Sequence, residues 1–291
     1  DRQRNRGGPP ETQQRTYCKQ GGYVSGHYFP GAYGRKPGEF EKGPAMSVNV
    51  ISVEKLTFYY NGIEVLQDIS FAVEKGSYLG VAGPNGSGKS TLIKNILGIL
   101  QPRQGNVYLF GQPLASFREW NKIGYLPQRL AALNTHFPGT VREIVQLGAG
   151  RKADSRNIAQ VLQMMEIEHL SSRPIGELSY GQQQRAMLAR ALASKPELLI
   201  FDEPTTALDP QTRENFYHLT HDLNLQQGTT IILVTHDTGV LGNYARRLLY
   251  LDKKIIFLGT FGDFCASAEM TDIFGGASQH IICHQHDRRS A

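Results

Sequence analysis

The segment GPNGSGKS at residues 83–90 constrains the fold of this 291-residue chain more than any other stretch. It matches the pattern GxxxxGK[ST], follows the apolar run YLGVA and precedes STLIKNILGIL, whose apolar residues recur at helical spacing. Between a strand and a helix, glycines let backbone N–H groups turn inward around phosphate oxygens, and the helix N-terminus favours anions. The residues predicted to line this phosphate site are Gly83, Pro84, Asn85, Gly86, Ser87, Gly88, Lys89, Ser90 and Thr91.

Two carboxylates follow the buried apolar run LLIF at 198–201. Asp202 is expected at the tip of that strand, where it would hold Mg²⁺ through water, together with the Ser90 hydroxyl. Glu203, one residue further on, points elsewhere and would polarise an attacking water. Lys89 would reach the β- and γ-phosphates. The combination predicts a site that binds a nucleoside triphosphate with Mg²⁺ and hydrolyses it.

Strands and helices alternate from residue 47 onward, which predicts an α/β fold. Apolar runs such as LLIF and IILV, separated by helical segments, indicate a parallel sheet covered on both faces. Helices are expected at TVREIVQLG, at SRNIAQVLQMMEI, after Gly181 and at QTRENFYHLTHDLN. The longest apolar stretches are strand-sized, so the chain itself is not expected to cross a membrane. Its three cysteines are far apart and lack a CxxC pair, which favours reduced thiols.

Five further short motifs accompany these two in a fixed order. They are FYYNG with Tyr60, IGYLPQ with Gln128, LSYGQQQR with Ser179, Gly181 and Gln182, TALDP with Asp209, and VTHD with His236. Together they resemble the ATP-binding subunit of an ATP-binding cassette (ABC) transporter over roughly residues 47–260. The resemblance implies a P-loop NTPase cassette with a RecA-like parallel-sheet core, an antiparallel β subdomain and a small helical subdomain at about 130–178.

The same resemblance implies a role for each motif residue. Tyr60 would stack on adenine, with Tyr59 as the alternative, and Gln128 would contact Mg²⁺ and sense the γ-phosphate. His236 would bind the γ-phosphate and align the water with Glu203. Ser179, Gly181, Gln182 and Asp209 would close over ATP held by a second, head-to-tail copy of the chain. Tyr180 replaces a glycine of the family pattern, so a bulky ring is expected to affect closure or turnover.

The transported substrate is suggested by two weaker features. The segment 123–148, with its FP-x-TV sequence, resembles the zinc and manganese importer branch, in which such a segment leads into a short helix that faces the permease. The tail HIICHQHD also fits that branch, and His280, Cys283, His284 and His286 are ligand types that suit Zn²⁺. Zinc is therefore the first expected cargo and manganese the second, with an iron complex or cobalamin as alternatives.

These implications extend to partners and location. They predict a peripheral subunit at the cytoplasmic face of the membrane, bound to separate permease subunits and served indirectly by an extracytoplasmic metal-binding protein. Gln128 and Leu178 lie 50 positions apart, so a helical subdomain between them is too short for the coiled coil of chromosome-maintenance relatives. A soluble ABC protein acting on nucleic acid and a non-enzymatic metal sensor remain rival hypotheses.

The ends of the chain differ from its centre in composition. Residues 1–46 are predicted to be a disordered, Gly-rich basic extension, with Met46 as the expected native start. Eight basic and four acidic residues lie within 1–45, so most of the net charge of +5 has this local source and no nucleic-acid partner is expected. Residues 261–291 are expected to form a C-terminal extension that carries the His/Cys tail.

Overall fold

The computed structural model describes residues 49–128, 137–150, 154–205, 208–276 and 279. The chain divides into two units, 1–45 and Met46–Ala291, and everything described below belongs to the second. The predicted N-terminal extension and the tail ligands His280, Cys283, His284 and His286 lie outside the described residues.

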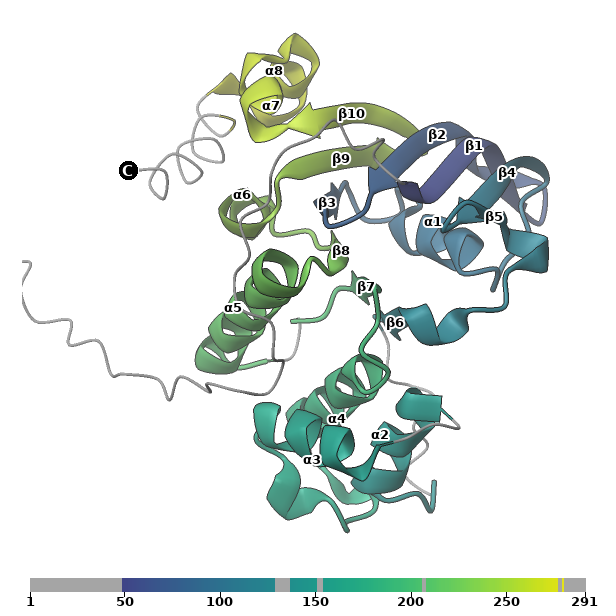
Figure 1. The fold of residues 1–291 in the computed structure, drawn as a ribbon. Helices are drawn as coiled ribbons and strands as arrows, with labels where there is room; N and C mark the ends of the chain where they lie inside the picture. Colours follow the sequence, from purple (N-terminus) through teal and green to yellow (C-terminus); the bar gives the residue numbers. More distant parts are fainter. Residues whose placement is uncertain (1–48, 129–136, 151–153, 206–207, 277–278, 280–291) are drawn as a thin grey trace, which may run out of the picture. The chain divides into compact units, whose positions relative to one another are not determined.

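Residues 49–113 contain a four-stranded antiparallel sheet (Figure 1). Its strands run in the order β2-β1-β4-β5, namely Ile63–Glu74, Asn49–Tyr60, Gln104–Leu109 and Gln112–Pro113. Asn61 and Gly62, with φ of 48° and 83°, form the tight turn between β1 and β2. This sheet corresponds to the antiparallel β subdomain that the family resemblance implied.

The second sheet has six strands in the order β10-β9-β3-β8-β7-β6. They are Lys254–Thr260, Arg247–Asp252, Tyr78–Ala82, Thr230–Val234, Leu198–Asp202 and Ile123–Leu126. All neighbours are parallel except β9 and β10, which pair antiparallel. Parallel neighbouring strands need long crossover connections, which explains why helices separate these strands in the sequence. The predicted α/β class is confirmed.

Apolar residues on both faces of this sheet are buried, because successive strand side chains alternate in direction. On β7, Leu198 and Ile200 join a core with Leu92 and Ile93 of α1 (Lys89–Ile96). The intervening residues of the strand join the opposite core, which also contains Phe216 of α5 (Pro210–Gln227) and Leu241 of α6 (Thr238–Tyr244). The two cores hold β3, β7 and β8 rigidly, and the candidate site lies where these strands end.

The helical group contains α2 (Val141–Ala149), α3 (Ser155–Met164) and α4 (Tyr180–Leu192), which pack on one another. Thr140 starts α2 with a capping box, in which its hydroxyl and the Glu143 carboxylate each satisfy a backbone N–H of the other residue. A Cβ on Gly148 would lie 2.0 Å from the Arg190 carbonyl oxygen, so only glycine permits this approach of α2 to α4. Helix α4 in turn packs on β6 and joins the group to the sheet.

Two short helices that the sequence did not reveal follow β10. They are α7 (Phe261–Ala266) and α8 (Ala268–Phe274). Gln279 is 3% exposed and donates to the carbonyls of Phe264 and Ser267 at 2.6 and 3.0 Å, so it covers the ends of these helices. Cys265 is disulfide-bonded, in contrast to the expected reduced thiols, and the other two cysteines lie outside the described residues. None of the described helices has the length and apolar character needed to cross a bilayer.

Candidate active site

The loop of residues 83–88 connects β3 to α1 as predicted. Gly83 has a φ of 149°, and a Cβ there would lie 2.0 Å from the Leu251 carbonyl oxygen of β9, so glycine is required at this position. The loop is closed by a hydrogen bond from the Ser87 N–H to the Pro84 carbonyl at 3.2 Å. It is tied to the β9–β10 turn because the Lys253 N–H donates to the Ser87 carbonyl at 3.0 Å.

The Lys89 ammonium is held inside this loop. Its Nζ donates to the carbonyls of Gly83 and Pro84 at 2.8 and 2.9 Å. Burial lowers the pKa of Lys89, and the nearby carboxylates of Glu203 and Asp202 oppose that shift. The structure therefore places a cation inside the loop and within electrostatic reach of both predicted carboxylates.

Asp202 ends β7 and is 1% exposed. Burial raises its pKa, whereas a hydrogen bond with Ser90 acts in the opposite direction. Its Oδ1 atom is buried without a hydrogen-bond partner in the described structure. A buried carboxylate oxygen beside a hydroxyl is a donor set that suits Mg²⁺, so these residues fit the predicted metal.

Glu203 adopts a left-handed backbone conformation with a φ of 52°. Its N–H donates to the Val234 carbonyl of β8 at 2.9 Å, and its Oε2 lies 2.9 Å from Nδ1 of His236. The Glu203 side chain is 9% exposed, whereas the imidazole is 66% exposed. The pair therefore places a sheltered carboxylate behind an accessible imidazole, which is an arrangement suited to holding and activating a water.

The LSYGQQQR motif at residues 178–185, called the signature motif below, contains the start of α4, which is called the signature helix. Ser179 caps this helix by accepting from the Gln182 N–H at 3.4 Å, and the Gln182 side chain accepts from the Ser179 N–H at 3.0 Å. Gly181 is the second residue of the helix, and the Tyr180 ring beside it is 48% exposed. The motif thus has the predicted helix N-terminus.

Three further predicted residues lie at the ends of elements. Asp209 caps α5 by accepting from the Thr212 N–H at 2.9 Å, and Thr212 also lowers the pKa of this carboxyl. Gln128 is exposed two residues beyond β6. Tyr60 ends β1 with its ring 42% exposed. Neighbouring Tyr59 is engaged by Glu64, whose Oε2 accepts from its hydroxyl at 2.8 Å, which leaves Tyr60 as the better candidate for stacking.

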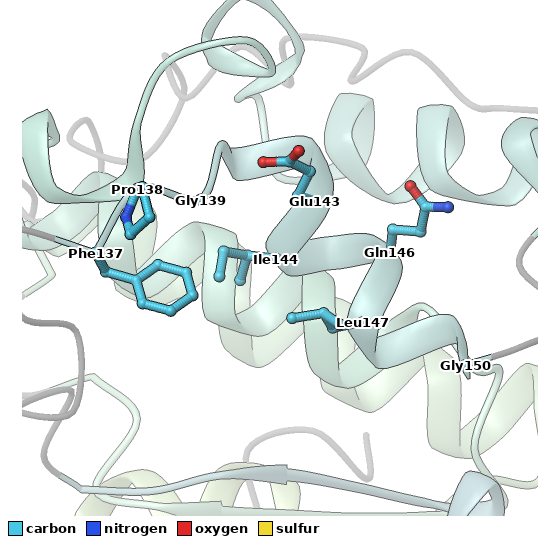
Figure 2. A pocket seen from close by; sticks show the side chains of 8 residues that line it. All are labelled: Phe137, Pro138, Gly139, Glu143, Ile144, Gln146, Leu147 and Gly150. Atoms are coloured by element: carbon cyan, nitrogen blue, oxygen red, sulfur yellow. The ribbon is translucent and has the colours of Figure 1, made fainter.

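A groove lies along α2 in the helical group (Figure 2). It has a volume of about 720 Å³ and is open to solvent. Phe137 and Leu147 present apolar side chains to it and are 40% and 67% exposed, and the buried residue Ile144 also lines it. The segment that the sequence linked to a permease therefore presents an apolar surface.

A family model described as ABC transporter matches residues 66–206. The zinc uptake system ATP-binding protein ZurA of Listeria innocua is 42% identical over 224 residues, which span 74% of this chain and 87% of that protein. The chain belongs to the ABC transporter family.

This ABC cassette has other close counterparts. The high-affinity zinc uptake system ATP-binding protein ZnuC of Bacillus subtilis is 37% identical over 215 residues, covering 71% of the chain and 92% of that protein. A solved dimeric ATP-binding cassette, in a post-hydrolysis state with ADP and Pi, matches with a TM-score of 0.65 and 30% identity. That match covers 72% of this chain and 98% of the other. The predicted family and cassette fold are confirmed.

Two contacts of the ABC cassette near Glu203 were not evident from the sequence. Gln184 of α4 donates to the Pro204 carbonyl, and the Thr205 hydroxyl lies 3.0 Å from the Tyr217 hydroxyl of α5. Both join residues far apart along the chain, and neither glutamine nor tyrosine at these positions has a spacing signal. Only the packing of α4 and α5 beside β7 reveals them.

Proposed function

We propose that the chain is the ATP-hydrolysing subunit of an ABC importer that drives zinc uptake through a separate membrane permease. The observation that carries the hydrolytic part is the pairing of Glu203 with His236, beside Lys89 in the phosphate loop. The names of the relatives from Listeria innocua and Bacillus subtilis support zinc as the cargo. Manganese is the second candidate cargo.

Each site residue has its own role in the proposed reaction. Lys89 leaves the carbonyls of Gly83 and Pro84 and binds the phosphates, with the N–H groups of residues 83–91 around them. Ser90, Asp202 and Gln128 hold Mg²⁺, which when bound offsets the negative charge of the phosphates. Tyr60 stacks on adenine. Glu203 accepts the proton of the attacking water, and His236 keeps that water aligned with the γ-phosphate.

A second copy of the chain completes each site in this proposal. Ser179, Gly181, Gln182 and Asp209 contact ATP bound by the partner, because helix N-terminal N–H groups favour phosphate oxygens. Support comes from the similar cassette that was solved as a dimer. Hydrolysis then requires closure of the pair, so turnover and dimerisation change together.

Replacement of the carboxylate tests the hydrolytic part directly. Glu203→Gln keeps the size of the side chain but removes the base, so kcat falls by about 10²–10⁴-fold while ATP binding persists. The variant is expected to accumulate as an ATP-bound dimer in size-exclusion chromatography. Near-normal phosphate release by purified Glu203→Gln would remove Glu203 from this role.

The groove along α2 is the proposed contact surface for the permease. Its exposed apolar side chains give a membrane subunit an anchoring site, and they belong to the segment resembling metal importers. Leu147→Glu is expected to abolish copurification with the permease and zinc accumulation in cells, while the isolated subunit keeps its ATPase activity. Met164→Glu, at an exposed apolar position of α3, is the matched control and should retain both.

Cargo and surroundings complete the proposal. The chain is placed at the cytoplasmic face of the membrane, with zinc delivered to the permease by an extracytoplasmic binding protein. Loss of the gene should reduce zinc accumulation more than manganese accumulation.

The tail residues His280, Cys283, His284 and His286 are proposed to bind cytosolic Zn²⁺. Truncation after Gln279, which keeps the buried contacts of Gln279 with the α7–α8 region, should leave ATPase activity intact and change the sensitivity of that activity to zinc. Equal zinc sensitivity in both forms would leave the tail without this role.

A further inference from the structure

The backbone at Glu203 is strained and needs to be held. A positive φ is unusual for a residue with a side chain, and the following proline further restricts its conformation. Such strain persists only where the surroundings fix the backbone. The contacts around Glu203 and Pro204 therefore determine where the carboxylate points.

Three neighbouring elements hold this short segment. Strand β8 accepts the Glu203 N–H through the Val234 carbonyl at 2.9 Å. Helix α5 contributes the Tyr217 hydroxyl, which lies 3.0 Å from that of Thr205. Helix α4 contributes Gln184, whose Nε2 donates to the Pro204 carbonyl. Of these contacts, the one from Gln184 acts on the Pro204–Thr205 peptide, which begins at the residue after Glu203.

The Gln184 side chain is 5% exposed, so its hydrogen bond is shielded from water. In a buried setting, loss of the amide donor would leave the Pro204 carbonyl unsatisfied, and water cannot readily replace it. The next residue of α4 contacts the first turn of α5, because Arg185 Nη2 lies 3.5 Å from the Thr212 hydroxyl. Helix α4 thus contacts both the Pro204 carbonyl and the start of α5.

We propose that Gln184 is a positioning residue for hydrolysis, which holds the Pro204–Thr205 peptide, and through Pro204 the backbone of Glu203, from the signature helix of the same chain. The inference rests on the proposed function, since it assumes that Glu203 activates the water. It gives α4 a second role, because this helix presents Ser179 and Gly181 at its N-terminus and orients the carboxylate one turn later. A shift of α4 within the helical group would then be transmitted to Glu203 through this hydrogen bond.

Gln184→Met tests the proposal, because methionine has a similar length but cannot donate. Misplacement of a reacting group by about 1 Å costs on the order of 100-fold, so kcat is expected to fall about 10- to 100-fold. The KM for ATP and the affinity for a fluorescent ATP analogue should remain those of the parent, because Gln184 lies outside the nucleotide contacts. The matched control is Gln183→Met, which removes bonds to the carbonyls of Ile175 and Leu178 within the helical group.

Gln184→Glu separates positioning from general loss of structure. A carboxylate cannot donate to the Pro204 carbonyl, but a protonated carboxyl can. The ratio of the kcat of Gln184→Glu to that of the parent should therefore rise as the pH is lowered. The same ratio for Gln184→Met should not change with pH. Parent-like kcat in Gln184→Met, an equal loss in Gln183→Met, or a flat ratio for Gln184→Glu would each overturn the proposal. A parent chain without ATPase activity would instead refute the proposed function.

Discussion

Asp202→Asn should make the nucleotide-free protein more stable while removing its response to MgATP. The side chain is 1% exposed and its Oδ1 has no hydrogen-bond partner in the described structure, so the ionised carboxylate is poorly solvated. An unsatisfied buried polar group costs about 1–3 kcal/mol, and asparagine keeps the shape and an oxygen that accepts from Ser90. We expect a gain of about 1 kcal/mol at neutral pH, or a rise in Tm of about 2–4 °C.

The raised pKa of Asp202 also predicts how the stability difference between the parent and Asp202→Asn changes with pH. Burial raises the pKa of Asp202 above its ordinary value of 3.8, so the folded state binds this proton more tightly than the unfolded state. The parent therefore loses stability as the pH rises from 3.8 through the raised pKa, and Asp202→Asn does not. The advantage of the variant should grow from acidic to neutral pH in urea denaturation experiments without Mg²⁺.

Asp263→Asn is the matched control, because this substitution should change stability in the opposite direction from Asp202→Asn. Hydrogen bonds from Thr260 lower the pKa of Asp263, so this ionised carboxyl contributes stability at neutral pH that is lost in acid. Asp263→Asn should therefore be less stable than the parent at neutral pH, with the difference closing as the pH falls.

Added MgATP should make the parent more stable than Asp202→Asn, which is the reverse of the order expected without nucleotide. A ligand at 100 times its Kd stabilises a folded protein by about 2.7 kcal/mol, and only the parent retains the carboxylate that holds Mg²⁺. If Asp202→Asn were less stable than the parent without nucleotide at neutral pH, or if its advantage did not change with pH, the burial argument would be wrong.

Three further predictions concern other parts of the fold. Gly83→Ala should weaken binding of a fluorescent ATP analogue more than Gly86→Ala, because its Cβ would lie 2.0 Å from the Leu251 carbonyl oxygen, whereas Gly86 faces open space; equal losses would contradict this. Asn224→Leu should lower the free energy of unfolding by about 3 kcal/mol, since the amide satisfies two loop carbonyls, and an unchanged urea midpoint would refute it. Tyr180→Gly should alter ATPase turnover and dimerisation, because the exposed ring stands at the signature helix N-terminus; no change in either would dispose of the idea.

The phosphate loop shows how much local sequence determines. A strand, a glycine-rich turn and a helix are adjacent in the chain, so residues 83–90 specify both the element order and the chemistry of Lys89. The same holds for the end of β7, where an apolar run followed by Asp202 and Glu203 predicts buried carboxylates. Helices α7 and α8 escaped prediction because each is short, with too few turns to show a helical period.

By itself, the sequence determined the α/β class, the phosphate loop and the order of the motifs, because these depend on patterns between neighbouring residues, and the motifs carried the resemblance that implied the cassette fold. The tertiary structure alone decided which distant groups meet. It paired Glu203 with His236, and it formed the hydrogen bonds from Lys89 to a carbonyl of its own loop and from Gln184 to the Pro204 carbonyl. Such contacts are set by how β7, β8 and α4 pack, and their distances depend on backbone geometry that no residue spacing encodes.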